Sequence, residues 1–270
     1  MTQTLNRAPA LGNIAIGAVS FIGLITFCLP FIVSGLAAHS MAGSTRTVDA
    51  SLLLAIVVAG ALTIAVGELV RAPCAGNLTR SIALLGALVA IDATLRLVPS
   101  FLGASPIFAL IILVGFVFGS RFGFAMGALT LMLSAAITAG VGPWLPFQML
   151  CAGWIGLAAG WLPHYRAGRV ELVTLTLFGF GSGFGYGALM NLYSWPFAAP
   201  GASANLGLYW APSLSFSESV ERYATYYLAT SLVHDATRAV ATAGILLVAG
   251  PQVIRLLRRF LSRTAWITSG

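Results

Sequence analysis

Two groups of ionisable side chains lie inside long apolar segments of this 270-residue chain. Asp92 and Arg96 are four residues apart in one segment, and His234, Asp235 and Arg238 lie together in another. A charged side chain in hydrocarbon is costly unless it is paired or hydrated, so each group needs a structural or functional reason. The spacing allows local ion pairs within each segment. It equally allows one polar site, lined by both segments and open to the outside.

The surrounding composition is that of a membrane protein. The chain is 59% hydrophobic and only 8% charged, with a mean hydropathy of +0.94. A soluble domain carries roughly 25% charged residues. Cys28, Cys74 and Cys151 have neither metal-ligand spacing nor an obvious pairing. A soluble enzyme, a disordered chain and a disulfide-rich secreted scaffold are therefore excluded.

The apolar segments predict an all-α polytopic membrane bundle of about eight transmembrane helices. A spanning helix needs about 20 mainly apolar residues, and open strands cannot cross lipid because their backbone groups would stay unpaired. The predicted spans are 11–37, 50–70, 80–98, 105–119, 122–141, 146–163, 171–192 and 222–249. The first has no small-residue cleavage site after it and is expected to be retained. A break in composition near 71–77 divides a two-helix extension (1–76) from a six-helix core (77–270).

The positions of the arginines predict the orientation. All 14 basic residues are Arg, against 7 acidic residues, which gives a net charge of +7. With the N-terminus in the cytoplasm, ten arginines fall inside: Arg7, Arg71, Arg80, Arg121, Arg166, Arg169, Arg255, Arg258, Arg259 and Arg263. Only Arg46 and Arg222 fall outside, and this bias follows the positive-inside rule. We expect a multi-pass protein of a prokaryotic inner or plasma membrane with both termini cytoplasmic, and no nucleic-acid binding.

Two outer segments could complete a binding site. Residues 140–149 contain two prolines, Trp144 and Gln148, and such irregular backbone at membrane depth either lines a cavity or forms a rigid turn. The connection 193–221 is long and aromatic, which suits either a lid or an interfacial aromatic belt. The predicted substrate-binding residues are Asp92, Arg96, Trp144, Gln148, Asn191, Tyr193, Trp195, His234, Asp235 and Arg238. No catalytic or metal-ligating set is predicted.

Small residues make one face of the helix expected at 80–98 smooth. Ala83 and Ala87 are four apart, as are Gly86 and Ala90. Such faces let helix backbones approach closely in lipid. The partner could be another helix of this chain or a different subunit.

A second glycine pattern raises an enzymatic alternative. Glycines alternate over residues 179–187, and Ser182 within that run could pair with His234 as a nucleophile and its base. A Gly-x-Ser-Gly motif would need glycine where Phe180 stands, which disfavours an intramembrane hydrolase.

In order along the chain, these motifs resemble the substrate-binding S component of energy-coupling factor (ECF) vitamin transporters. The resemblance covers roughly the last two hundred residues, and its clearest part runs from Arg80 to Pro163. The residues that carry it are Ala83 and Ala87, the turn Gly119–Gly123 with Gly127, the segment Gly142–Gln148, Gly153, Gly156 and Gly160, and Asp235 and Arg238 ahead of Gly250-Pro251.

The resemblance implies a membrane-embedded binding subunit that is not itself an enzyme. Its partners would be a transmembrane coupling (T) subunit and two cytoplasmic ABC ATPases, which bind ATP and Mg, while this chain binds no cofactor. The smooth face of Ala83, Gly86, Ala87 and Ala90 would dock on the T subunit. The arrangement is closest to the cobalamin group, with a thiamin precursor as the next substrate. Many S components have six helices, so the N-terminal pair is a departure.

A stand-alone secondary transporter is the other transport class. It would normally show inverted repeats with broken helices, and the two halves of this chain share no convincing repeat.

Overall fold

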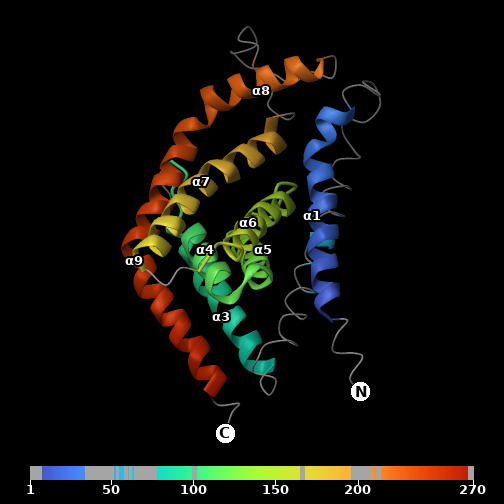
Figure 1. Ribbon diagram of the computed structural model, residues 1–270. Coiled ribbons are helices and arrows are strands. Elements are labelled where there is room, and N and C mark those ends of the chain that lie inside the picture. The colour runs from blue at the N-terminus through green and yellow to red at the C-terminus, as the bar shows by residue number, and fades with distance from the viewer. Residues whose placement is uncertain are drawn as a thin grey trace.

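The computed structural model describes residues 8–33, 52, 55–57, 60, 63, 78–98, 102–164, 168–195, 208, 210 and 214–266. Every regular element in these ranges is a helix, which confirms the predicted all-α class (Figure 1). The helices are α1 (Ala8–Val33), α3 (Leu78–Leu95), α4 (Ile107–Phe118), α5 (Ser120–Ile137), α6 (Leu145–Ala159), α7 (Gly168–Ser194), α8 (Phe216–Thr230) and α9 (Leu232–Trp266). The predicted span 50–70 and the connection 193–221 fall mostly outside the described residues.

Several helices have the composition that a bilayer requires. Ser120–Ile137, Gly168–Ser194 and Leu232–Ser262 are long and apolar enough to cross a membrane. Four further apolar helices are shorter, at Asn13–Cys28, Ile82–Leu95, Ile107–Phe118 and Leu145–Ala159. The architecture is that of a polytopic helix bundle.

The core of the bundle is α4. Its side chains are apolar on all sides, and Ile111, Ile112 and Val114 are completely buried. A helix without a polar face is stable only when neighbours cover it all round. Here α3, α5, α6, α7 and α9 do so, and Figure 1 shows α4, α5 and α6 between α1 and α9.

Glycines set the closest helix contacts in this core. A Cβ added to Gly123 of α5 would overlap the backbone of Gly156 in α6, and the reverse also holds. Gly115 of α4 meets the same Gly156 carbonyl. Because packing rather than the hydrophobic effect holds helices together in lipid, these backbone contacts stabilise the α4–α5–α6 unit directly.

One residue makes the turn between α4 and α5. Gly119 has φ +98°, a conformation that suits a residue without a Cβ, and its N–H donates to the Gly115 carbonyl at 2.9 Å. The tight turn predicted at Gly119–Gly123 is confirmed, although a helix resumes already at Ser120.

The predicted single span at 222–249 is wrong. The chain breaks at Ser231 between α8 and α9, and α9 then continues through Pro251 to Trp266. The segment before the break is amphipathic and begins with a capping box, in which Ser215 and Glu218 bond each other's backbone N–H. This polar start makes α8 a separate short helix rather than the first part of a span.

Helix α1 packs on the side of α6. The Phe27 and Phe147 rings meet edge to face at 4.8 Å, and Trp154 Nε1 donates to Ser20 Oγ at 2.8 Å. The start of α1 and the end of α9 lie at one end of the bundle, with α8 at the other (Figure 1). The division of the chain at residues 76 and 77 stays a prediction.

Candidate functional site

Arg96 joins three helices at the α8 end of the core. Helix α3 ends at Leu95, so the half-buried Arg96 lies in the turn that follows. Its Nη1 donates to Ser134 Oγ of α5 at 2.8 Å, and its Nη2 donates to Gln148 Oε1 of α6 at 3.4 Å. The structure therefore brings together Arg96 and Gln148, two residues of the predicted set. Ser134 was missed because a serine in an apolar helix carries no distinctive pattern.

Asp92 makes no ion pair with Arg96, so the local pair that their spacing allowed does not form. The Asp92 side chain is fully buried, and neither carboxylate oxygen has a hydrogen-bond partner. It lies beside Thr130 of α5 without forming a hydrogen bond of normal geometry. Because α3 ends before Arg96, the two side chains do not share the helical face that their spacing suggested.

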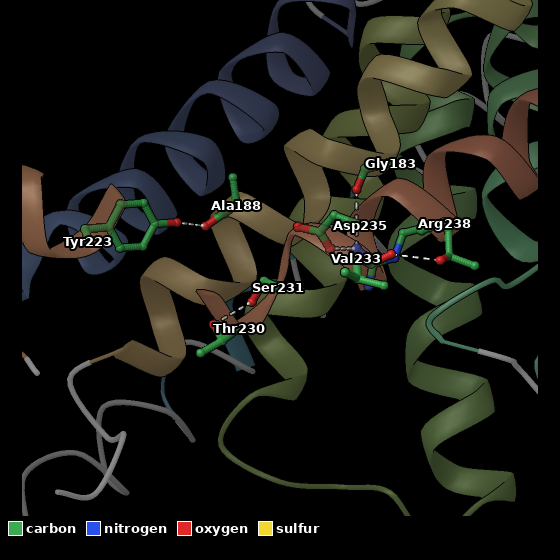
Figure 2. A network of polar contacts seen from close by, with 9 residues as sticks. Gly183, Ala188, Tyr223, Thr230, Ser231, Val233, Asp235 and Arg238 are labelled. Atoms are coloured by element: carbon green, nitrogen blue, oxygen red, sulfur yellow. Dashed lines mark hydrogen bonds and ion pairs between the residues drawn. The ribbon is translucent and has the colours of Figure 1, made fainter. Parts of the chain in front are cut away.

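The other local pair that the spacing allowed, between Asp235 and Arg238, does form. Asp235 and Arg238 form an ion pair one turn apart on α9, with exposed fractions of only 2% and 14%. Arg238 also donates to the Gly183 carbonyl of α7 at 3.3 Å, and its guanidinium carbon lies 5.2 Å from the centre of the Tyr186 ring. Figure 2 shows Asp235, Arg238 and Gly183 together between α7 and α9. A cation over an aromatic face is stabilised further when it is largely desolvated.

The glycines of α7 make room for this pair. A Cβ on Gly187 would overlap the Asp235 carboxylate, and one on Gly183 would overlap the backbone of Ala239. Gly181 and Gly185 meet nothing within 4 Å. The alternating glycines thus form two faces, of which only one packs against α9.

Tyr186 lies beneath the Arg238 guanidinium. Its buried side chain packs edge to face on Phe108 of α4, with ring centres 4.7 Å apart. The guanidinium groups of Arg238 and Arg96 both lie within electrostatic range of its phenol. Sequence reasoning missed Tyr186; its signal was a hydroxyl-bearing aromatic within the glycine run.

The connection between α3 and α4 closes over the Arg238 end of the site. Gly103 has φ +84°, and a Cβ there would lie 3.2 Å from both Arg238 Nη2 and the His234 carbonyl. The His234 side chain itself is exposed.

The remaining predicted site residues lie around this centre. The Tyr193 ring packs at a tilt of 32° against Phe147, next to Gln148, with ring centres 4.3 Å apart. Asn191 is half-buried near the end of α7, and the Trp144 side chain is 44% exposed. Ligand contact at these three positions stays a prediction.

Trp195 is packed inside an aromatic cluster. It is completely buried, its Nε1 donates to the Leu208 carbonyl at 2.8 Å, and its ring lies edge to face with Tyr223 of α8 at 5.5 Å. Tyr223 in turn donates to the Ala188 carbonyl of α7 (Figure 2). Trp195 therefore fastens α8 to the end of α7.

A further polar cluster at the opposite end was not predicted. Glu171 of α7, 7% exposed, accepts from Arg258 Nη2 of α9 at 2.7 Å. Arg258 lies over the Phe116 ring at 5.7 Å, and the His164 ring stacks on that ring at 4.2 Å. This cluster joins the ends of α4, α7 and α9.

The smooth face of α3 is open among the residues that the structure describes. Ala83, Gly86, Ala87 and Ala90 are all exposed, and nothing lies within 4 Å of a Cβ placed on Gly86. The described residues thus give no support to the alternative that this face packs inside the chain.

The hydrolase alternative requires a hydrogen bond between Ser182 and His234, and the structure does not show one. Ser182 Oγ donates to the Gly179 carbonyl of its own helix at 2.9 Å, and no hydrogen bond joins it to the exposed His234. Among the described residues, no group of three His, Cys, Asp or Glu side chains could hold a metal ion.

The described residues form an all-helical bundle with apolar helices and buried polar groups, which is the architecture of a polytopic membrane protein. The family described as ECF transporter, substrate-specific component, matches residues 80–250, well over half of the chain. The protein belongs to this family of S components, which are multi-pass membrane transport subunits and not enzymes. Membership implies a T component, ATPase partners and a small substrate. Comparison with curated proteins and with solved structures gave no significant match.

Proposed function

We propose that this chain captures a vitamin-like molecule on the outer side of a prokaryotic membrane. It would deliver the molecule inward together with a T subunit and two cytoplasmic ABC ATPases. The observation that carries this proposal is the paired polar arrangement within the matched region. Arg96 is held by α5 and α6, Arg238 is held by α7 and α9, and Tyr186 is near both. By resemblance the substrate is a corrinoid of the cobalamin group, with a thiamin precursor as the second candidate.

The exposed small-residue face of α3 is the proposed docking surface for the T subunit. Ala83, Gly86, Ala87 and Ala90 would let a helix of that subunit approach at backbone distance. ATP and Mg would bind only the partner ATPases, and this chain would need no cofactor of its own.

In the proposed orientation both termini are cytoplasmic, and α8 lies at the outer surface. The cytoplasmic end would then carry Arg255, Arg258 and Arg259, in agreement with the positive-inside rule. Segment 193–221 and α8 would cover the site from outside. Residues 1–76 would be an extension to the core, and its helix α1 packs on α6.

The test is to purify the chain in mild detergent and identify the co-purifying small molecule by mass spectrometry. The proposal expects one vitamin-like compound at near-stoichiometric amount, and ATP-dependent uptake in cells only when the T subunit and ATPases are co-expressed. Uptake into liposomes that contain this chain alone would instead support a secondary transporter and overturn the proposal.

A further inference from the structure

Arg96 differs from Arg238 and Arg258, two arginines of α9 that also join helices of the bundle. Arg238 is paired with Asp235 and Arg258 with Glu171. Arg96 has hydrogen bonds only to the neutral oxygens of Ser134 and Gln148.

No carboxylate in the described part of the chain provides its counter-charge. Asp92, four residues earlier, is buried against α5 without a partner. Glu218 bonds Ser215 at the start of α8. Asp235 and Glu171 are already paired, and Glu221 is exposed on α8 and makes no ion pair with Arg96. A half-buried guanidinium without a counter-ion is an expensive group in a membrane protein.

The hydrogen bonds that Arg96 does make hold it in one orientation. A guanidinium has five N–H donors, and Ser134 and Gln148 each accept one. The remaining donors can meet a planar oxyanion side by side, a geometry that a guanidinium provides and an ammonium does not. Tyr186, which belongs to the same centre, already has Arg238 over its ring face.

We infer that Arg96 receives a monoanionic oxygen group of the transported molecule, namely a carboxylate or the chemically similar phosphodiester. The inference rests on the proposed function and narrows its substrate class. Among the described residues Arg96 is paired with no carboxylate, so a monoanion balances its charge, whereas a dianionic phosphate would leave a negative charge buried. A thiamin-precursor pyrimidine, which carries no anionic group, would leave Arg96 unpaired.

The test compares matched ligands on the purified full chain by thermal melting and isothermal titration. The probes are biotin with biotinamide, nicotinate with nicotinamide, and pantothenate with pantothenol. Cobalamin carries a phosphodiester, while thiamin and riboflavin carry no anionic group. One acid or cobalamin is expected to bind, and the neutral twin of a binding acid should bind about 10- to 100-fold more weakly, the range expected for one charge-assisted hydrogen-bonded pair.

Variants of Arg96 test whether this residue binds the anionic group of the probe. In Arg96→Gln the affinity for the bound probe should fall by about the same factor, and Arg96→Lys should restore part of it. The matched control Arg259→Gln removes an equal charge at the far end of α9 and should leave the affinity unchanged. The melting temperature of ligand-free Arg96→Gln should equal or exceed that of the native chain, because no internal ion pair is lost.

The outcomes separate the inference from the proposed function. Binding of thiamin or riboflavin, equal binding of an acid and its neutral twin, or an Arg96→Gln chain that fails to fold would each overturn the inference alone. If none of the probes binds and no small molecule co-purifies, the proposed function fails as well.

Discussion

Gly187 of α7 lies directly against the carboxylate of Asp235 on α9. A side chain at position 187 would occupy the space of both carboxylate oxygens. The ion pair between Asp235 and Arg238 therefore depends on the absence of a Cβ one helix away.

This contact predicts opposite effects for two neighbouring glycines. Gly187→Ala should displace Asp235 and lower the melting temperature in detergent, whereas Gly185→Ala, which meets nothing within 4 Å, should be neutral or stabilising by up to about 1 kcal/mol through helix propensity. Fluorescence-detected thermal melting of both variants provides the measurement. Equal destabilisation by the two substitutions would show that the packing face of α7 is misassigned.

The Asp235–Arg238 pair should contribute mainly to folding. Asp235→Asn leaves the Arg238 charge uncompensated in a nearly buried position, and we expect a loss on the order of 3 kcal/mol. The double variant Asp235→Asn with Arg238→Gln should recover part of that loss, since it removes the stranded charge. The readout is the melting temperature together with the yield of folded protein. A double variant no more stable than the single one would contradict this account.

Substitution of Asp92 should not lower the stability of the chain as substitution of Asp235 does. Its carboxylate is buried without a hydrogen bond or ion pair, so Asp92→Asn removes a costly group and should leave the melting temperature unchanged or raised. A clear fall in the melting temperature would mean that Asp92 has a stabilising partner after all. Asp235→Asn serves as the paired comparison, because the same chemical change there breaks an ion pair.

The α3 surface predicts a loss of complex assembly without a loss of folding. Gly86→Leu places a bulky side chain on an open face and should weaken co-purification of the T subunit, while the melting temperature of the isolated chain changes little. Ile82→Leu, at another exposed position of α3, is the matched control. Undiminished recovery of the T subunit with Gly86→Leu would remove this face from the proposal.

The cap of α8 predicts a local dependence on pH. Hydrogen bonds from Ser215 hold the pKa of Glu218 below its ordinary value of 4.5. A lowered carboxyl pKa stabilises the folded state above the unfolded pKa, and this contribution is lost as the pH falls through the folded value. Proteolysis of α8 should therefore accelerate below about pH 4.5 in the native chain, and Glu218→Gln should show a much weaker pH dependence. An unchanged pH profile in the variant would rule the cap out as its source.

Much of the fold could be predicted because a bilayer imposes strong constraints on sequence. Each spanning segment must satisfy its own backbone hydrogen bonds and remain apolar, so the helices from α3 to α7 were located to within a few residues. The break at Ser231 was missed, since hydropathy averages over the polar start of α8. The close spacing of Asp235 and Arg238 on one helix made their ion pair predictable as well.

Spacing along the chain did not predict side-chain contacts correctly where a helix ended or where the partner residues came from distant segments. Asp92 and Arg96 have the spacing of an ion pair, yet α3 ends between them, and Arg96 bonds Ser134 and Gln148, 38 and 52 residues away. Likewise, only packing decided which glycines of α7 face α9 and that the smooth face of α3 is left open. The sequence alone determined that the chain lies in a membrane, that its fold is all-α, and which ionisable residues lie inside apolar segments. The tertiary structure decided which charges neutralise each other, because pairing depends on distances that only the packed bundle defines.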